Sequence, residues 1–139
     1  MSPWCENLVP LSAPAVTKLP PALAVIDGSL CELTREGARR CGYAPLATAV
    51  VEFCDGPMSV YVREHPYGLL PGIPNLYCLD RALRLQWLAD WPASVGPCTR
   101  IIGASGDVLL AESESGAVIR LDAQTGQLCG VDQPLAAAG

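Results

Sequence analysis

The chain has 139 residues, of which 50% are hydrophobic and 17% are charged, and its net charge is -5 at pH 7. This composition supplies a core for one domain and excludes disorder over most of the chain. The nine basic residues include a single lysine and form no run, which argues against a nucleic-acid-binding surface. Neither a membrane-spanning helix nor a secretory signal peptide is evident in the sequence. We therefore expect a cytoplasmic protein that binds neither nucleic acid nor membrane.

Residues 1–21 contain five prolines, spaced so that neither a continuous helix nor a central strand can form. We expect an extended N-terminal arm that lies across the domain. The next segment, residues 22–35, predicts a hairpin around the turn Asp27-Gly28. A short helix within 30–40 is the alternative interpretation.

Eight short apolar segments follow, separated by turns rich in Gly, Pro, Asp and Ser. Alternation of apolar and polar residues, clearest in 59–63, is typical of strands. The expected strands are 47–53, 58–64, 75–79, 83–89, 98–102, 108–112, 117–121 and 128–131. They predict two four-stranded antiparallel meanders, at about 47–90 and 98–131, followed by a frayed tail at 133–139.

The two meanders share a short sequence motif, in which the third strand ends in Leu-Asp and is followed by a turn. The second copy, "VIRLDAQTGQLCG", resembles the quinoprotein-type (PQQ-like) β-propeller repeat, which has an apolar strand, Asp, a Thr-Gly turn and a strand ending in Trp. Asp122, Thr125 and Gly126 match this pattern, and the Trp is missing. The first copy keeps Asp80 and Trp87 and lacks the glycine.

The resemblance implies structural roles for these residues. The Asp side chain accepts hydrogen bonds from the turn's own backbone, and Gly supplies a positive φ. The Trp provides a large flat surface that docks one sheet against the next. Quinone-binding residues of propeller enzymes are spread over many blades, so none carries over to this chain and no cofactor is implied.

Closed propellers need at least about four blades, and this chain has material for two, or two and a half if the first hairpin counts. We therefore expect a mostly β fold, a single domain over residues 22–132, in which the two meanders pack as a sandwich or bent sheet. A ring of several chains, or a blade-like fragment that completes a partner, are the alternatives.

Seven cysteines are spread widely along the chain, and no Cys-x-x-Cys pair is present. Zinc sites usually have paired ligands a few residues apart, so we expect no metal. In a reducing compartment the thiols are expected to act as small core hydrophobes. Cys54, Cys78 and Cys129 lie in apolar segments that fit this role.

The loop 64–75 and the segment that follows the next strand pair contain the candidate binding residues. Apolar side chains on a proline-stiffened loop lose little entropy on binding, and tryptophan is frequent at binding hot spots. The predicted partner-binding residues are Tyr67, Leu69, Leu70, Ile73 and Trp91. The alternative is that the loop's apolar residues cover an open end of the core.

These features predict a small, non-enzymatic protein-binding module of inhibitor, immunity or assembly-accessory type. The step from fold to role is an analogy. One alternative is a small hydrolase that uses His65 with a nearby carboxylate or thiol. Another is a propeller-like homo-oligomer that assembles through open sheet edges.

Overall fold

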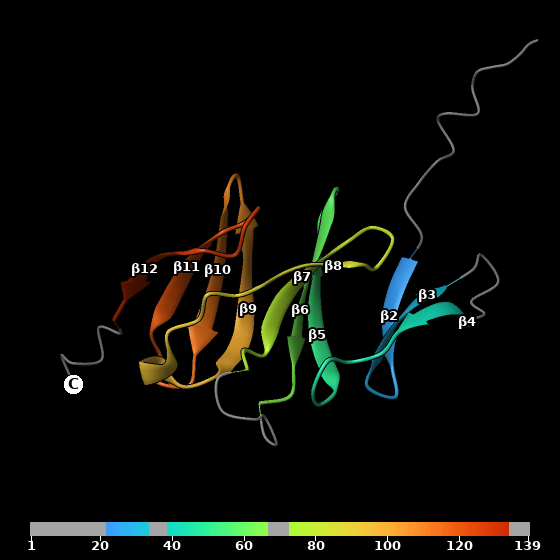
Figure 1. Cartoon of the computed structure of the whole chain (residues 1–139), viewed down its shortest axis with the longest axis horizontal. Coiled ribbons are helices and arrows are strands. Elements are labelled where there is room, and N and C mark those ends of the chain that lie inside the picture. Colours follow the sequence, from blue (N-terminus) through green and yellow to red (C-terminus); the bar gives the residue numbers. More distant parts are fainter. Residues whose placement is uncertain (1–21, 34–38, 67–72, 134–139) are drawn as a thin grey trace, which may run out of the picture.

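The computed structural model describes residues 22–33, 39–66 and 73–133, so the predictions for the arm at 1–21 and for residues 134–139 lie outside the described residues. The strands are labelled as in Figure 1. They are β2 (Ala22–Ile26), β3 (Ser29–Leu33), β4 (Arg39–Tyr43), β5 (Val50–Asp55), β6 (Ser59–Glu64), β7 (Leu76–Asp80), β8 (Leu85–Leu88), β9 (Cys98–Ser105), β10 (Val108–Ser113), β11 (Val118–Asp122) and β12 (Leu128–Asp132). A 3-10 helix, η1 (Ala93–Val95), precedes β9.

These strands form three antiparallel sheets. We call β2-β3-β4 the N-terminal sheet, β5-β6-β7-β8 the middle sheet and β9-β10-β11-β12 the C-terminal sheet. The three sheets follow one another along the long axis of the molecule (Figure 1). The mostly β fold with two four-stranded meanders is therefore confirmed.

The N-terminal region differs from its prediction. The helix considered within 30–40 is wrong for the described part, because residues 29–33 and 39–43 are strands. The expected hairpin gains β4 as a third strand, paired with β3. The middle sheet is therefore covered on both faces, and the molecule has one layer more than a two-sheet sandwich.

Alternate residues along each strand of the middle sheet point to opposite faces, and the residues on both faces are mostly apolar. Val60 and Val62 point toward the N-terminal sheet and pack with Leu30. Tyr61, between them, points toward the C-terminal sheet. The register continues this second face as one row across the sheet, which consists of Cys54, Tyr61, Cys78 and Trp87. The row packs against the buried side of the C-terminal sheet, where the Tyr61 hydroxyl donates to the carbonyl of Ala123 at 3.3 Å.

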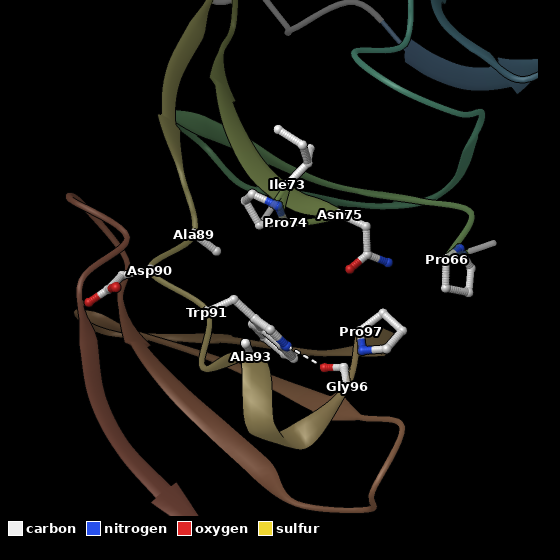
Figure 2. Close-up of a pocket in the computed structure, with 10 residues that line it drawn as sticks. All are labelled: Pro66, Ile73, Pro74, Asn75, Ala89, Asp90, Trp91, Ala93, Gly96 and Pro97. Atoms are coloured by element: carbon white, nitrogen blue, oxygen red, sulfur yellow. Dashed lines mark hydrogen bonds between the residues drawn. The ribbon is translucent and has the colours of Figure 1, made fainter. Parts of the chain in front are cut away.

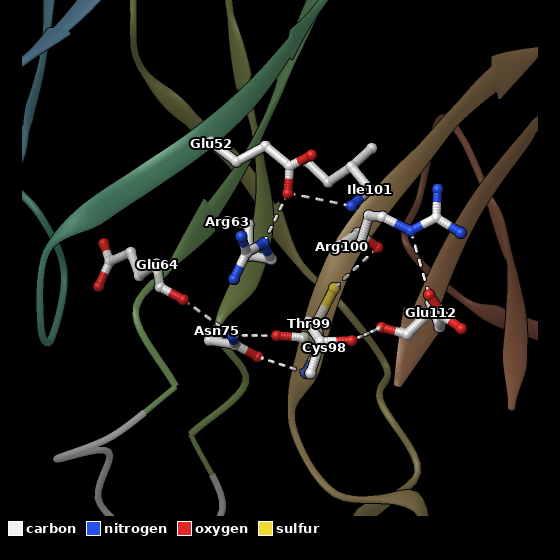
Figure 3. Close-up of polar contacts among 9 residues, drawn as sticks. All are labelled: Glu52, Arg63, Glu64, Asn75, Cys98, Thr99, Arg100, Ile101 and Glu112. Carbon is white, nitrogen blue, oxygen red and sulfur yellow. Dashed lines mark hydrogen bonds and ion pairs between the residues drawn. The ribbon is translucent and has the colours of Figure 1, made fainter. Parts of the chain in front are cut away.

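Polar side chains tie the middle sheet to the C-terminal sheet (Figure 3). A carboxylate oxygen of Glu52 accepts from Nε of Arg63 at 2.6 Å and from the backbone N–H of Ile101 at 3.1 Å. The buried Asn75 amide accepts from the backbone N–H of Cys98 and donates to its carbonyl and to that of Glu64. Because Asn75 and the backbone groups that it binds are buried, loss of its amide would leave unpaired polar groups.

The two Leu-Asp turns are closed by equivalent backbone hydrogen bonds but differ in length by one residue. A carboxylate oxygen of Asp122 accepts from the N–H groups of two residues in its turn, and Gly126 follows with φ 78° and donates to the Asp122 carbonyl. Asp80 also accepts from two turn N–H groups, and Leu83 donates to the Asp80 carbonyl with φ 64°. Leu83 therefore occupies, in a turn one residue shorter, the left-handed position that Gly126 occupies.

Candidate functional site

A cavity of about 430 Å³ lies where the connection from the middle sheet to the C-terminal sheet passes the loop before β7 (Figure 2). Residues just after β6 and just before β7 contribute, together with the segment after β8 and the residues around η1. The lining consists of Pro66, Ile73, Pro74, Asn75, Ala89, Asp90, Trp91, Ala93, Gly96 and Pro97.

The cavity brings together two of the five predicted binding residues. Ile73 is 40% exposed and Trp91 is partly buried, and both line it. Tyr67, Leu69 and Leu70 lie outside the described residues. In the part of the chain that the structure describes, two of the predicted residues therefore lie on opposite sides of the same cavity (Figure 2).

Trp91 is fixed by a local hydrogen bond. Its Nε1–H donates to the carbonyl of Gly96 at 2.7 Å across the short helix η1 (Figure 2). Gly96 has φ 80°, and a Cβ there would approach the Glu114 side chain to 2.7 Å. The indole therefore presents its ring to the cavity, and its donor is already used.

The polar residues of the lining are also engaged. Asn75 uses both ends of its amide to bind backbone groups. Asp90, the titratable residue among the ten that line the cavity, accepts from the backbone N–H of Leu128 at 3.2 Å, and its carboxylate points away from the other lining side chains in Figure 2. The side chains that line the cavity are therefore mostly apolar, contributed by proline, alanine, isoleucine and tryptophan, while Asn75 and Asp90 add polar surface.

The wall formed by Ala93, Gly96 and Pro97 was not predicted. Its sequence signal is the pair of prolines that brackets η1, Pro92 and Pro97, which stiffens the connection between the sheets. That signal indicates a rigid connection, but the approach of this connection to Ile73 depends on how the two sheets pack.

His65, the residue considered for hydrolysis, is exposed on the loop after β6. Its backbone N–H donates to the carbonyl of Ala49, and its carbonyl accepts from the Thr48 hydroxyl. Within residues 22–33, 39–66 and 73–133, no cluster of three or more His, Cys, Asp or Glu side chains could hold a metal ion.

The carboxylate of the adjacent Glu64 has a structural role. It is 1% exposed and accepts from the backbone N–H groups of residues 46–48 and from the Tyr77 hydroxyl at 2.5 Å. Burial alone would raise its pKa, but the hydrogen bonds from Thr48, Tyr77 and their neighbours hold the pKa below its ordinary value. The same contact, added to burial, raises the pKa of Tyr77. Both oxygens of Glu64 thus accept hydrogen bonds from within the fold.

The described cysteines differ in how far they are buried. Cys78 is buried as expected and Cys54 is partly buried, but the prediction that Cys129 lies in the core is wrong, since it is exposed on β12, the last strand of its sheet. Burial raises the pKa of Cys78, and it raises that of Cys98 to about 12. Buried thiols of this kind are poor nucleophiles.

Comparison with models of known protein families and with curated proteins finds no match. The part of the chain that the structure describes contains no helix with the length and apolar character needed to cross a bilayer.

Proposed function

We propose that the chain is a non-enzymatic protein-binding module that takes an apolar segment of another protein into the cavity between Ile73 and Trp91. The supporting observation is that the cavity, of about 430 Å³, is lined mostly by apolar side chains, and that the Trp91 indole N–H and one carboxylate oxygen of Asp90 are hydrogen-bonded within the fold. Its size falls in the range of roughly 300–1,000 Å³ typical of binding pockets. A tryptophan held in one orientation loses little entropy on binding, which favours its use as an anchor.

The proposed role is that of an inhibitor, immunity-type or assembly-accessory protein, which acts by covering a partner's surface. The cytoplasm is the proposed compartment. Five cysteines are described as free thiols, Cys31, Cys54, Cys78, Cys98 and Cys129. A reducing compartment maintains cysteines in this state.

A propeller-like ring is the second candidate, and the relation between consecutive sheets favours it. Trp87 of the middle sheet docks on Gly126 of the C-terminal sheet, as the resemblance to PQQ-like repeats implies. The outer face of the C-terminal sheet argues against a further docked sheet. On this face Arg120 lies across Gly130 and forms an ion pair with Asp132 at 3.3 Å. A polar outer face of this kind is typical of the last repeat in a stack of repeats.

The binding proposal is tested by partner capture from the native host with matched surface variants. Ile73→Ser changes an exposed side chain in the cavity, and Trp91→Ala removes the anchor. Ile102→Ser changes a side chain that is also 40% exposed but lies on the C-terminal sheet. We expect the first two variants to lose a partner that the wild type and Ile102→Ser retain, with circular dichroism confirming that all are folded. Retention of the same partner by both cavity variants would contradict the proposal.

A further inference from the structure

The N-terminal sheet ends at β4, whereas each of the other sheets has a fourth strand. Its three strands lie over the first three strands of the middle sheet. β2 contacts β5, and Leu30 on β3 packs against the valines of β6. The ring of Tyr43 on β4 lies 5.9 Å from the ring of Tyr77 on β7. A strand added at the outer edge of β4 would therefore lie over β8.

The face of β8 at that place is apolar and exposed. Leu88 is paired with Tyr77, and Leu85 with Leu79, so the two β8 leucines share the face that meets the N-terminal sheet. Leu85 is 45% exposed and Leu88 is 43% exposed, whereas Tyr77 and Leu79 are 0% exposed. The N-terminal sheet thus covers this face as far as β7 and leaves β8 uncovered in the described structure.

The other interface shows what a fourth strand contributes. In the middle sheet, β8 supplies Trp87, which packs on the turn at Gly126 of the C-terminal sheet. Val131 on β12 packs against the same cluster. The corresponding place beside β4 has no strand in the part of the chain that the structure describes, so none of the described strands uses the backbone groups on its outer edge.

Leu83 limits which side chain fits there. It occupies the turn position equivalent to Gly126, and it is buried in the cluster between the N-terminal and middle sheets. At this turn position a leucine side chain is therefore present, whereas in the other interface the glycine at the equivalent position lies against Trp87. An added strand would need an aliphatic residue, smaller than tryptophan, at the position that faces Leu83.

We propose that the outer edge of β4, together with Leu83, Leu85 and Leu88, accepts an extended strand from a partner protein. The strand forms backbone hydrogen bonds with β4 and places alternate aliphatic side chains on the three leucines. This surface shares no residue with the lining of the cavity at Trp91. It is therefore independent of the proposed function of that cavity.

The probe for this surface is a peptide derived from β8, the fourth strand of the middle sheet. It has the sequence of residues 84–90, RLQWLAD, with the change Trp87→Val, and it carries a fluorescent label. Fluorescence anisotropy with the full-length chain is expected to show saturable binding. Leu85→Ser and Leu88→Ser in the protein should each weaken it about fivefold or more, because each removes apolar area buried by the strand. Ile102→Ser, which changes an equally exposed side chain on the C-terminal sheet, is the control and should leave the affinity unchanged.

Two further measurements examine the strand geometry and the role of Leu83. Methylation of alternate backbone nitrogens of the peptide should abolish binding, because it removes the donors that face β4. Leu83→Gly should shift the preference from the valine peptide toward the unmodified tryptophan peptide, since the space beside the turn is then open.

The proposal is overturned if the valine peptide does not bind, or if both serine variants bind it as the wild type does. It is also overturned if light scattering shows a dimer that the peptide dissociates, because a second copy then fills the groove.

Discussion

The indole of Trp87 lies directly against the backbone of Gly126, so that a Cβ on Gly126 would come within 2.7 Å of Cδ2 of the indole. The two residues belong to different sheets, and the contact fixes how closely the middle and C-terminal sheets approach. Gly126 also has φ 78°, so glycine is required there for two separate reasons, the backbone conformation and the absence of a side chain.

Gly126→Ala should destabilise the fold through both effects. We expect a loss of about 2–4 kcal/mol, combining a left-handed alanine with overpacking against the indole. Gly106→Ala is the matched control, because Gly106 has φ 61° but no atom within 4 Å of the added Cβ. It should lose only about 1–2 kcal/mol, the conformational part. Urea denaturation measures both, and equal losses would show that the contact with Trp87 contributes nothing.

Leu83 occupies the turn position equivalent to that of Gly126. Glycine is usually favoured at a left-handed turn position, but we expect the replacement of Leu83 by glycine to destabilise the fold. Leu83→Gly relieves a left-handed leucine, worth roughly 1–2 kcal/mol, but removes a side chain that is 7% exposed. Because core truncations of leucine cost about 2–5 kcal/mol, we expect a net destabilisation of about 1–3 kcal/mol. Leu83→Asn, which tolerates the same conformation without filling the space, should behave similarly. A glycine variant more stable than the wild type in urea denaturation would show that Leu83 does not fill the interface.

Apolar runs, alternation and turn residues were enough to place the strands from 47 onward, because each expected strand there is a short apolar or alternating segment next to a turn rich in Gly, Pro, Asp or Ser. β4 was missed because Arg39, Arg40 and Gly42 give it no such alternation, and pairing with β3 makes it a strand. The left-handed conformation of Leu83 was missed for a related reason, since its turn lacks the glycine that would indicate it. Ile73 and Trp91 were predicted as separate candidates, and only the packing of the connection around η1 places them in one cavity.

Glu64 should make the stability of the fold depend on pH at the acidic end. Its folded-state pKa is held below the ordinary value of about 4.3. The carboxylate therefore contributes stability that is fully present above that value and is lost as the pH falls through the folded-state pKa. Glu64→Gln, which cannot accept all the bonds from residues 46–48 and Tyr77, should cost about 2–4 kcal/mol at pH 7.

The pH profile distinguishes this role from a simple packing defect. The difference in unfolding free energy between wild type and Glu64→Gln should shrink as the pH falls below the ordinary carboxyl value of about 4.3 and through the lower folded-state pKa, where the wild-type carboxyl becomes protonated. Glu114→Gln, the same substitution at an exposed position, is the control and should change the unfolding free energy at pH 7 little. A difference that stays constant with pH would mean that the ionised carboxylate is not the stabilising species.

Cys98 and Cys129 should differ strongly in their reaction with iodoacetamide. Burial raises the pKa of Cys98 to about 12, so at pH 8 almost none of it is the reactive thiolate, and its side chain is 0% exposed. Cys129 is exposed on the last strand, with its sulfur 3.7 Å from the carbonyl of Gln127. Mass spectrometry of tryptic peptides should show Cys129 modified in the native protein and Cys98 modified only when denaturant is added. The variant Cys129→Ser should remove the fast reaction at that site without changing the unfolding midpoint. Modification of Cys98 in the native protein at the rate of Cys129 would mean that the strand β9 opens far more often than its buried position and its bonds to Asn75 imply.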